Sequence, residues 1–363
     1  MDKPIAILGA GNGGRAMAAG LTLDGFRVNL FELPEFANEF KVIMESGKIK
    51  LSSARRSGWA RLNMATTNIK DALHDVGLVL ICVPAFGQKR MAEVCIPQLR
   101  NDMIVVFVPG GFGSFLFYRT MQELGADQDI TLAEVATLPY GARIQSADEV
   151  LIHIDAIKLP TGVFPANRTN QIIKVLQKLY SAINPAEDIL DVALKNLNPC
   201  VHSAPSILNT GRIEFAEDFF IYREGITPSV RRVMVAVDRE RQKIREAWGY
   251  GPPHYGLDPT SYENYEDYFG RGVADIVGKK MRGPLSMMHR YITEDIPYGL
   301  VFYASVGDVV GIDTPACDAL ISLASIINDE NYWLTGRTLA SLGLDDKSFT
   351  QIKMLLKDSD NRY

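Results

Sequence analysis

The stretch ILGAGNGGRAMAAGL, residues 7–21, places four glycines and an asparagine between a short apolar run and an alanine-rich run. Gly9, Gly11 and Gly14 occupy the three glycine positions of a dinucleotide fingerprint. The first permits a tight turn, the second lets the backbone approach a pyrophosphate, and the third lets a helix pack closely on a strand. The positive end of that helix favours phosphate. The spacing therefore predicts a site for a nicotinamide dinucleotide.

An acid in the right place indicates which dinucleotide. Glu32 ends the next apolar run, eighteen residues beyond Gly14, where a carboxylate can accept hydrogen bonds from both ribose hydroxyls and repel a 2′-phosphate. This favours NAD, while Arg27 nearby keeps NADP open. The carboxyl end of a further apolar run adds Val83, Pro84 and Ala85. We predict that the cofactor contacts Gly9, Gly11, Asn12, Gly13, Gly14, Glu32, Val83, Pro84 and Ala85.

Five histidines are the side chains best suited to transfer protons near neutral pH. Three of them have no convincing polar partner in their local pattern and are interpreted as structural: His74, His153 and His254. His202 and His289 remain as candidates. In KNLNPCVHSAPSILN, Asn198 and His202 stand one helical turn apart, so both can face the same side if the segment is helical.

A second polar cluster lies far along the chain. The stretch HRYITEDIPYGL supplies Arg290, Glu294 and Asp295. Composition and spacing alone do not pair His202 with an acid so distant in sequence.

The elements that must position these residues change in character along the chain. The 363 residues are enough for two domains. Apolar runs predict a doubly wound parallel sheet with a helix over Asn12–Leu23, which we expect to be amphipathic. The predicted strands are Pro4–Leu8, Arg27–Phe31, Val79–Val83, Ile104–Val108 and Ile130–Glu134. Between Gly47 and Thr67 the pattern is irregular and basic, which indicates a small hairpin or a loop with a solvated face.

From about Ile189 onward, helical spacing replaces the short apolar runs, and we predict a mostly α-helical second domain. In Ser229–Trp248 apolar residues form one stripe, with Arg and Glu expected on the opposite face. Thr314 followed by Pro315 predicts a helix start, with the helix running through Ile327. The predicted domains are residues 1–186, a dinucleotide-binding Rossmann domain, and residues 187–363, a helical substrate domain.

Composition excludes several classes of protein. Hydrophobic residues make up 47% and charged residues 22%, as in globular proteins. A net charge of −5 argues against nucleic acid as a partner. The apolar stretches are too short for a bilayer, and no signal peptide is recognisable, so we expect a cytoplasmic protein. The four cysteines are widely spaced, which predicts buried thiols and no metal site.

Four segments together carry a family resemblance. The glycine turn, NLNPCVHSAP, YREGITPSV and RYITEDIPYGLV, in this order and at these separations, resemble the opine dehydrogenases, the octopine and nopaline dehydrogenase family. The resemblance covers nearly the whole chain, and the second-domain motifs are more specific than the glycine fingerprint. It implies a Rossmann domain followed by an α-helical domain, with the active site in the cleft between them.

The resemblance also implies chemistry and residue roles. Opine dehydrogenases condense the amino group of an amino acid with a 2-oxo acid such as pyruvate and reduce the imine with NAD(P)H. The family's catalytic histidine falls on His202 and its paired aspartate on Asp295. The family's substrate-binding arginine falls on Arg290, and Arg143 in LPYGARI also looks matched. Asn198 is a further candidate for substrate binding. A homodimer is a candidate for the assembly of this chain.

Two other functions remain alternatives at this stage. ALKN, residues 193–196, looks like the lysine-asparagine motif of glycerol-3-phosphate dehydrogenases, in which Lys195 would be the proton-transferring group on a hydroxyl substrate. Those enzymes share neither EGITPSV nor the stretch from Arg290 to Asp295. A dinucleotide-binding sensor without catalysis would keep the glycine turn but give no role to His202.

Overall fold

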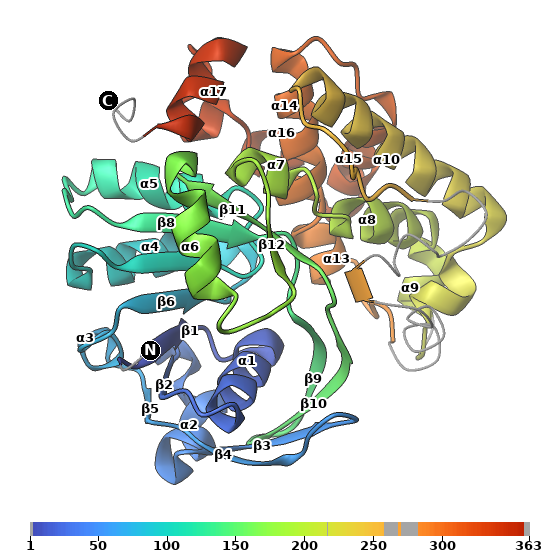
Figure 1. Ribbon diagram of the computed structural model, residues 1–363. Coiled ribbons are helices and arrows are strands. Elements are labelled where there is room, and N and C mark those ends of the chain that lie inside the picture. The colour runs from blue at the N-terminus through green and yellow to red at the C-terminus, as the bar shows by residue number, and fades with distance from the viewer. Residues whose placement is uncertain (1–2, 216, 258–267, 270–281, 359–363) are drawn as a thin grey trace. The chain divides into compact units, whose positions relative to one another are not determined.

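The structure, a computed structural model, describes residues 3–215, 217–257, 268–269 and 282–358. The chain divides into two compact units, one of residues 1–192 with 356–363 and the other of residues 193–355 (Figure 1). The sequence-based limits, 1–186 and 187–363, stay a prediction of where the two domains could be separated.

An eight-stranded sheet forms the centre of the first unit, in the order β12-β11-β8-β7-β6-β1-β2-β5. From β5 to β8 every pair is parallel, and this part has the strand order 3-2-1-4-5-6 of a Rossmann fold. β11 joins antiparallel to β8. The predicted fold class is confirmed. The strands are β1 (Ile5–Leu8), β2 (Val28–Phe31), β5 (Met64–Thr66), β6 (Leu78–Ile81), β7 (Ile104–Phe107), β8 (Thr131–Val135), β11 (Leu159–Phe164) and β12 (Ile183–Pro185).

The five predicted strands correspond to β1, β2, β6, β7 and β8, and their limits agree to within two residues. Every residue of β1, β2 and β6 is buried, because helices cover both faces of a parallel sheet. The helices of this unit are α1 (Asn12–Leu23), α2 (Ala37–Ser46), α3 (Ile69–Ala72), α4 (Gln88–Cys95), α5 (Gly113–Glu123), α6 (Thr169–Leu176) and α7 (Ile189–Ala193).

Helix α1 has the predicted limits, but the expectation that it is amphipathic is wrong. Residues 13–21 are all buried, including Arg15. A second sheet, in the order β4-β3-β10-β9, packs against the side of α1 that faces away from β1 and β2 (Figure 1). A helix covered on both sides needs apolar or small residues all round, which explains its alanines. The strands of this sheet are β3 (Lys48–Ser53), β4 (Gly58–Arg61), β9 (Tyr140–Ser146) and β10 (Glu149–Asp155).

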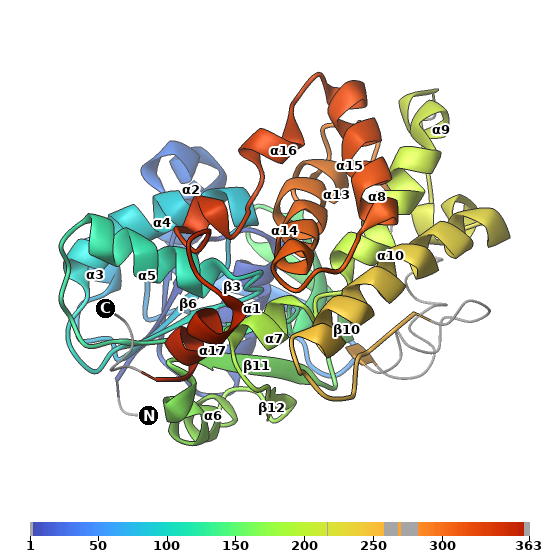
Figure 2. The same cartoon turned by 90° about the horizontal axis from the view of Figure 1, so that it is seen from above.

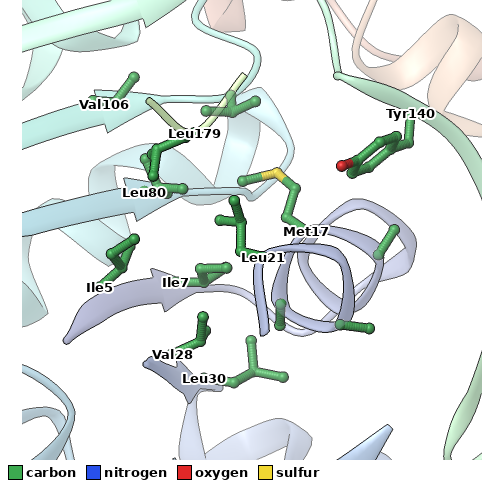
Figure 3. Packing of buried hydrophobic residues seen from close by; sticks show 14 of the residues in the cluster. Ile5, Ile7, Met17, Leu21, Val28, Leu30, Leu80, Val106, Tyr140 and Leu179 are labelled. Atoms are coloured by element: carbon green, nitrogen blue, oxygen red, sulfur yellow. The ribbon is translucent and has the colours of Figure 1, made fainter. Parts of the chain in front are cut away.

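Figure 3 shows the core between α1 and the large sheet. Met17 and Leu21 point from the helix toward Ile7 and Leu80 on the strands. The irregular basic segment is the antiparallel pair β3–β4 followed by β5. Three of its cations pair with acids of the same unit: Lys50 with Glu149, Arg55 with Asp155 and Arg56 with Asp24. The predicted hairpin is thus confirmed, and Lys50 and Arg55 pair with acids while remaining exposed to solvent.

The described residues of the second unit form mainly helices, as predicted (Figure 2). No helix in the described ranges has both the length and the apolar character of a membrane span. The α-helices are α8 (Asn198–Leu208), α9 (Thr210–Phe215), α10 (Pro228–Ala247), α13 (Arg290–Thr293), α14 (Val301–Val309), α15 (Pro315–Asn328), α16 (Tyr332–Thr335) and α17 (Phe349–Lys357), and two π-helical turns are η5 (Ile221–Gly225) and η6 (Ile296–Leu300).

Helix α10 contradicts the expected separation of apolar and charged faces. The apolar stripe is largely buried, but so are four charged residues on the same helix: Asp238, Glu240, Arg241 and Arg245. Arg241 pairs with Asp238, which accepts from its Nε at 2.8 Å. A buried charge is tolerated when the charged group is paired and hydrogen-bonded. We therefore interpret these residues as structural.

Glu240 fixes the start of α15. Its Oε1 accepts a hydrogen bond from the Ala316 N–H at 2.7 Å, and its Oε2 accepts from the Cys317 N–H at 3.0 Å. Thr314 occupies the expected N-cap position, but its hydroxyl donates to the Asp318 carboxylate at 2.9 Å and does not cap the backbone. The cap of α15 therefore comes from Glu240 on α10, whereas the sequence pattern had predicted Thr314 as the cap.

Replacing Glu240 by Gln should lower the unfolding temperature of the second unit, because a neutral amide replaces the charge that faces two N–H groups. Losing a hydrogen bond to a charged group costs about 1.5–3 kcal/mol, and each kcal/mol corresponds to about 2–4 °C. Glu246→Gln is the matched control, because it makes the same chemical change on α10 at a side chain that is 63% exposed. Calorimetric transitions that are equal in the two variants would contradict the capping role.

Candidate functional site

The glycine turn between β1 and α1 contains glycines that the fold itself requires. Gly9 has a φ of +103°, and a Cβ there would lie 2.4 Å from the Cys82 carbonyl oxygen. A Cβ on Gly14 would lie 1.8 Å from the Gly9 carbonyl oxygen. A Cβ on Gly11 would meet no atom within 4 Å. Gly9 and Gly14 thus serve the turn and the helix–strand contact, while Gly11 faces open space that a pyrophosphate can enter.

Asn12 and Gly13 are also engaged by the fold. The Asn12 Oδ1 accepts a hydrogen bond from the Ile144 N–H at 2.7 Å, which ties the turn to β9. A Cβ on Gly13 would lie 2.8 Å from the Cys82 Sγ and 2.8 Å from a Leu138 methyl carbon. Both residues hold the turn in place, and their contacts with a cofactor stay a prediction.

Glu32 lies beside the turn, directly after β2. Its Oε2 accepts from the Ala10 N–H at 2.6 Å and its Oε1 from the Leu33 N–H at 2.8 Å. Burial raises the pKa of this carboxyl, and these two hydrogen bonds together with nearby Arg15 oppose the rise. A carboxylate offers about four lone-pair positions, so each oxygen can still accept a hydroxyl. Glu32 is therefore positioned by the turn that it borders.

Val83, Pro84 and Ala85 follow β6, the neighbour of β1. Gly9 and Val83 are in close contact, since a Cβ on Gly9 would lie 2.8 Å from the Val83 Cγ1. β1 and β6 lie where the strand order reverses, and this is the point at which open α/β sheets bind ligands. The predicted cofactor residues from both strands are thus brought to one edge of the sheet.

In the second unit, His202 lies on α8 and is only 4% exposed. Its Nδ1 is 2.8 Å from the Asp295 Oδ2, and its Nε2 is 2.8 Å from the Tyr222 hydroxyl. Asp295 is 6% exposed. An ionised Asp295 accepts the Nδ1 proton and leaves Nε2 as the acceptor of the neutral ring. The structure therefore brings together the two residues that are 93 positions apart in sequence.

The two partners of the imidazole lie in or directly before π-helical turns. Asp295 is the residue directly before η6, and Tyr222 lies within η5. π-Helical turns are rare in proteins, and those that occur are often found at functional sites. Asn198 is the first residue of α8, so the expected placement of Asn198 and His202 on one helix is confirmed.

Tyrosines complete the surroundings of His202. The Tyr291 ring stacks on the imidazole with centroids 3.7 Å apart and an interplanar angle of 12°. The Tyr222 and Tyr291 hydroxyl oxygens are 3.3 Å apart. Sequence reasoning missed both residues, although they lie inside the quoted motifs YREGITPSV and RYITEDIPYGL. Tyr291 could have been found from its position beside Arg290, a residue that the sequence had already indicated as a candidate. No nearby residue in the sequence indicated a role for Tyr222.

Arg290 begins α13, and its side chain is 45% exposed. Its Nε lies 3.7 Å from the Glu294 Oε2. His289, the other histidine candidate, caps this helix: its Nδ1 accepts from the Tyr291 N–H at 3.3 Å. Arg143 lies on β9 of the first unit, where its terminal NH1 group donates to the Ala142 carbonyl. Its role beside His202 stays a prediction.

The turn before α8 is held by three side-chain donors from other segments. Arg241 donates to the Leu194 carbonyl, Tyr268 to the Lys195 carbonyl at 2.8 Å, and Tyr303 to the Asn196 carbonyl. Lys195 itself is 7% exposed. Because the carbonyls are consecutive, these bonds fix the direction in which α8 starts and thereby the position of His202.

Further predictions from the sequence concern His254 and the four cysteines. His254 has polar partners, contrary to the interpretation of its local pattern: its Nδ1 accepts from the Arg245 Nε at 3.3 Å. The cysteines form no disulfide; Cys95, Cys200 and Cys317 are buried as expected, whereas Cys82 is only half-buried. Among the described residues no group of His, Cys, Asp and Glu side chains could hold a metal ion.

Comparisons with known proteins show which sequences and folds this chain resembles. Residues 185–328 match the model of the α-helical domain of NAD/NADP octopine/nopaline dehydrogenases. The opine dehydrogenase of Arthrobacter sp. (strain 1C) is 29% identical over 355 residues, which cover 94% of this chain and 96% of that protein. An octopine dehydrogenase solved with NADH and L-arginine shares the fold, with a TM-score of 0.74 and 19% identity over 96% of this chain and 97% of the other.

A shorter match concerns the lysine alternative. A glycerol-3-phosphate dehydrogenase of Moorella thermoacetica is 35% identical over 107 residues, which cover 29% of this chain and 31% of that protein. Opine and octopine dehydrogenases are among the matches that cover nearly the whole chain. The helical unit is therefore similar to the α-helical domain of octopine/nopaline dehydrogenases, and the chain as a whole is similar to opine dehydrogenases.

Proposed function

We propose that this protein is an NAD(P)H-dependent opine dehydrogenase. It condenses the amino group of an amino acid with a pyruvate-like 2-oxo acid, reduces the imine to a secondary amine dicarboxylate, and catalyses the reverse oxidation. The observation that carries the proposal is His202, buried between Asp295 and Tyr222 in the helical unit of this family. In that arrangement Nδ1 of the imidazole is bonded to Asp295, and Nε2 remains the nitrogen that can exchange a proton in the reaction.

His202 acts as general acid and base. Loss of water from the carbinolamine requires an acid, and the reverse reaction requires a base. An imidazole suits both because its unperturbed pKa of about 6.5 lies near working pH. Asp295 keeps the proton on Nδ1 and stabilises the imidazolium, as the acid partner does in other histidine-centred sites.

The first unit is suited to a dinucleotide. The open space at Gly11, the turn built by Gly9 and Gly14, and the unused lone pairs of Glu32 fit a pyrophosphate and a ribose. Bound NADH or NADPH supplies the hydride. Glu32 favours NADH because a carboxylate repels a 2′-phosphate.

Cations are needed for a substrate that carries two carboxylates. Arg290 is the leading candidate, because its guanidinium is partly exposed near the acid that pairs with His202. A guanidinium can bind a carboxylate through two parallel hydrogen bonds. Arg143 is the second candidate, and Asn198 supplies an amide on the helix of His202.

The alternative with Lys195 as the acid is not favoured. The lysine lies in the turn that Arg241, Tyr268 and Tyr303 hold in place. The corresponding sequence match covers less than a third of the chain. We also propose a cytoplasmic enzyme of amino acid metabolism without nucleic-acid or membrane partners, and a homodimer as its assembly.

The direct test of the function is oxidation of NADH with pyruvate and each amino acid in turn, with mass detection of a condensed product. A product whose mass equals the sum of both substrates minus water plus two hydrogens is expected with at least one amino acid. Amides of the 2-oxo acid, which lack the carboxylate, should react poorly. Binding of NADH without any product across the full panel would favour the sensor alternative.

His202→Asn should lower the rate of product formation by about 100-fold or more, because the proton carrier is lost. Lys195→Met removes the charge of the alternative acid and should retain a much larger share of the rate. NADH binding should be the same in both variants. Initial rates at saturating substrates decide between them, and full activity of His202→Asn would remove the central residue of the proposal.

Gly11→Ala and Gly14→Ala should fail in different ways. Alanine at position 11 meets no protein atom, so the first unit should keep its unfolding temperature while NADH binding weakens. Alanine at position 14 collides with the Gly9 carbonyl and should lower the unfolding temperature itself. Calorimetry and NADH fluorescence titration separate the two effects. Unchanged NADH affinity in Gly11→Ala would contradict a pyrophosphate at that position.

A further inference from the structure

Both nitrogens of the His202 imidazole are hydrogen-bonded in the structure. Nδ1 meets Asp295 and Nε2 meets the Tyr222 hydroxyl, each at 2.8 Å. The side chain is 5% exposed, and the Tyr291 ring covers one face. A proton that enters or leaves the ring must therefore pass through a hydrogen-bonded neighbour. Asp295 holds the far nitrogen, so the neighbour on the reactive side is Tyr222.

The hydrogen-bond directions follow from the chemistry of the groups. With the proton of a neutral ring on Nδ1, Nε2 accepts from the Tyr222 O–H. The single proton of that phenol is then used, so the Tyr291 hydroxyl donates to the Tyr222 oxygen, 3.3 Å away. When the ring is protonated, Nε2–H donates to the Tyr222 oxygen, and the phenol proton is released to another acceptor. The same two oxygens thus support either charge state of His202.

Tyr222 is also the more accessible partner. It is half-buried, whereas His202 and Asp295 are buried, and Arg223 and Glu224 that follow it are exposed. It lies in the π-helical turn η5, a type of turn that is frequent at functional sites. We propose that Tyr222 is a catalytic residue whose hydroxyl transfers the proton between His202 and the substrate. This inference rests on the proposed function.

The step balances without a further reactant. The carbinolamine C–O bond breaks, and its oxygen takes the Tyr222 phenol proton and leaves as water. The lone pair of the substrate nitrogen forms the C=N bond of an iminium ion. The Tyr222 oxygen takes the Nε2 proton, so the imidazolium becomes neutral and keeps its Nδ1 proton on the side of Asp295. The positive charge moves from the imidazolium to the iminium, which the hydride then reduces.

Tyr222→Phe tests the relay, with Tyr291→Phe as the matched control. Tyr222→Phe should lower kcat by about 100-fold or more, whereas Tyr291→Phe keeps its ring and should lose at most about tenfold, the cost of one neutral hydrogen bond. In Tyr222→Phe the proton step should become the slowest. The solvent isotope effect on kcat should therefore rise, and the effect of deuterium at the transferred position of NADH should fall toward one.

Several results would overturn the relay. A kcat for Tyr222→Phe near or above the wild-type value means that Nε2 acts directly. A lower kcat with an unchanged solvent isotope effect assigns Tyr222 a purely structural role. Should Tyr222→Phe misfold, Tyr222→3,5-difluorotyrosine keeps the ring and the hydroxyl while making the phenol more acidic. The relay predicts an altered kcat and solvent isotope effect for it, and wild-type values of both contradict the relay.

The failure of the relay is distinguishable from the failure of the proposed function. A wild-type protein that forms no condensed product overturns the function and the relay together. An active wild-type protein with an equally active Tyr222→Phe variant overturns the relay alone. NADH binding and unfolding temperature, measured for each variant, identify misfolding before the rates are compared.

Discussion

The hydrogen bond between His202 and Asp295 is the interaction on which the helical unit depends for its chemistry. Both side chains are buried, and a buried carboxylate is costly unless it is paired. The pair requires α8 and the residue before η6 to meet at one point. The donors to the Leu194, Lys195 and Asn196 carbonyls fix where α8 starts. Asp295, directly before η6, and Tyr222, within η5, then contact the two nitrogens of the imidazole.

Carboxylates that accept backbone N–H groups recur through the molecule; Glu134 and Glu240 are buried and Glu32 is half-buried. Glu32 accepts from Ala10 and Leu33 beside the glycine turn. Glu134, which is fully buried, accepts from the Phe112 and Ser114 N–H groups at the start of α5. Glu240 does the same for α15. In each case one carboxylate joins its own segment to a backbone segment 20 or more residues away.

The features that the sequence predicted are the local ones. Short apolar runs identified β1, β2, β6, β7 and β8, and the glycine spacing identified the turn, because strands and tight turns depend on neighbouring residues. The second sheet was missed in part, and with it the full burial of α1, because β9 and β10 come from residues 140–155. Arg and Glu of α10 were expected opposite its apolar stripe, yet Glu240, Arg241 and Arg245 are buried, since helical spacing does not show which partners other segments supply. The His202–Asp295 pair came from family resemblance, as spacing carries no information across 93 residues.

The central claim is that Asp295 keeps the proton of neutral His202 on Nδ1 and leaves Nε2 for chemistry. The most direct measurement is the pair of ring ¹⁵N chemical shifts of His202, recorded at a pH where the imidazole is neutral, in the wild-type protein and in Asp295→Asn. We expect a protonated Nδ1 and an unprotonated Nε2 in the wild type, and a shift toward the other tautomer in the variant. A wild-type imidazole that carries its proton on Nε2 would contradict the account.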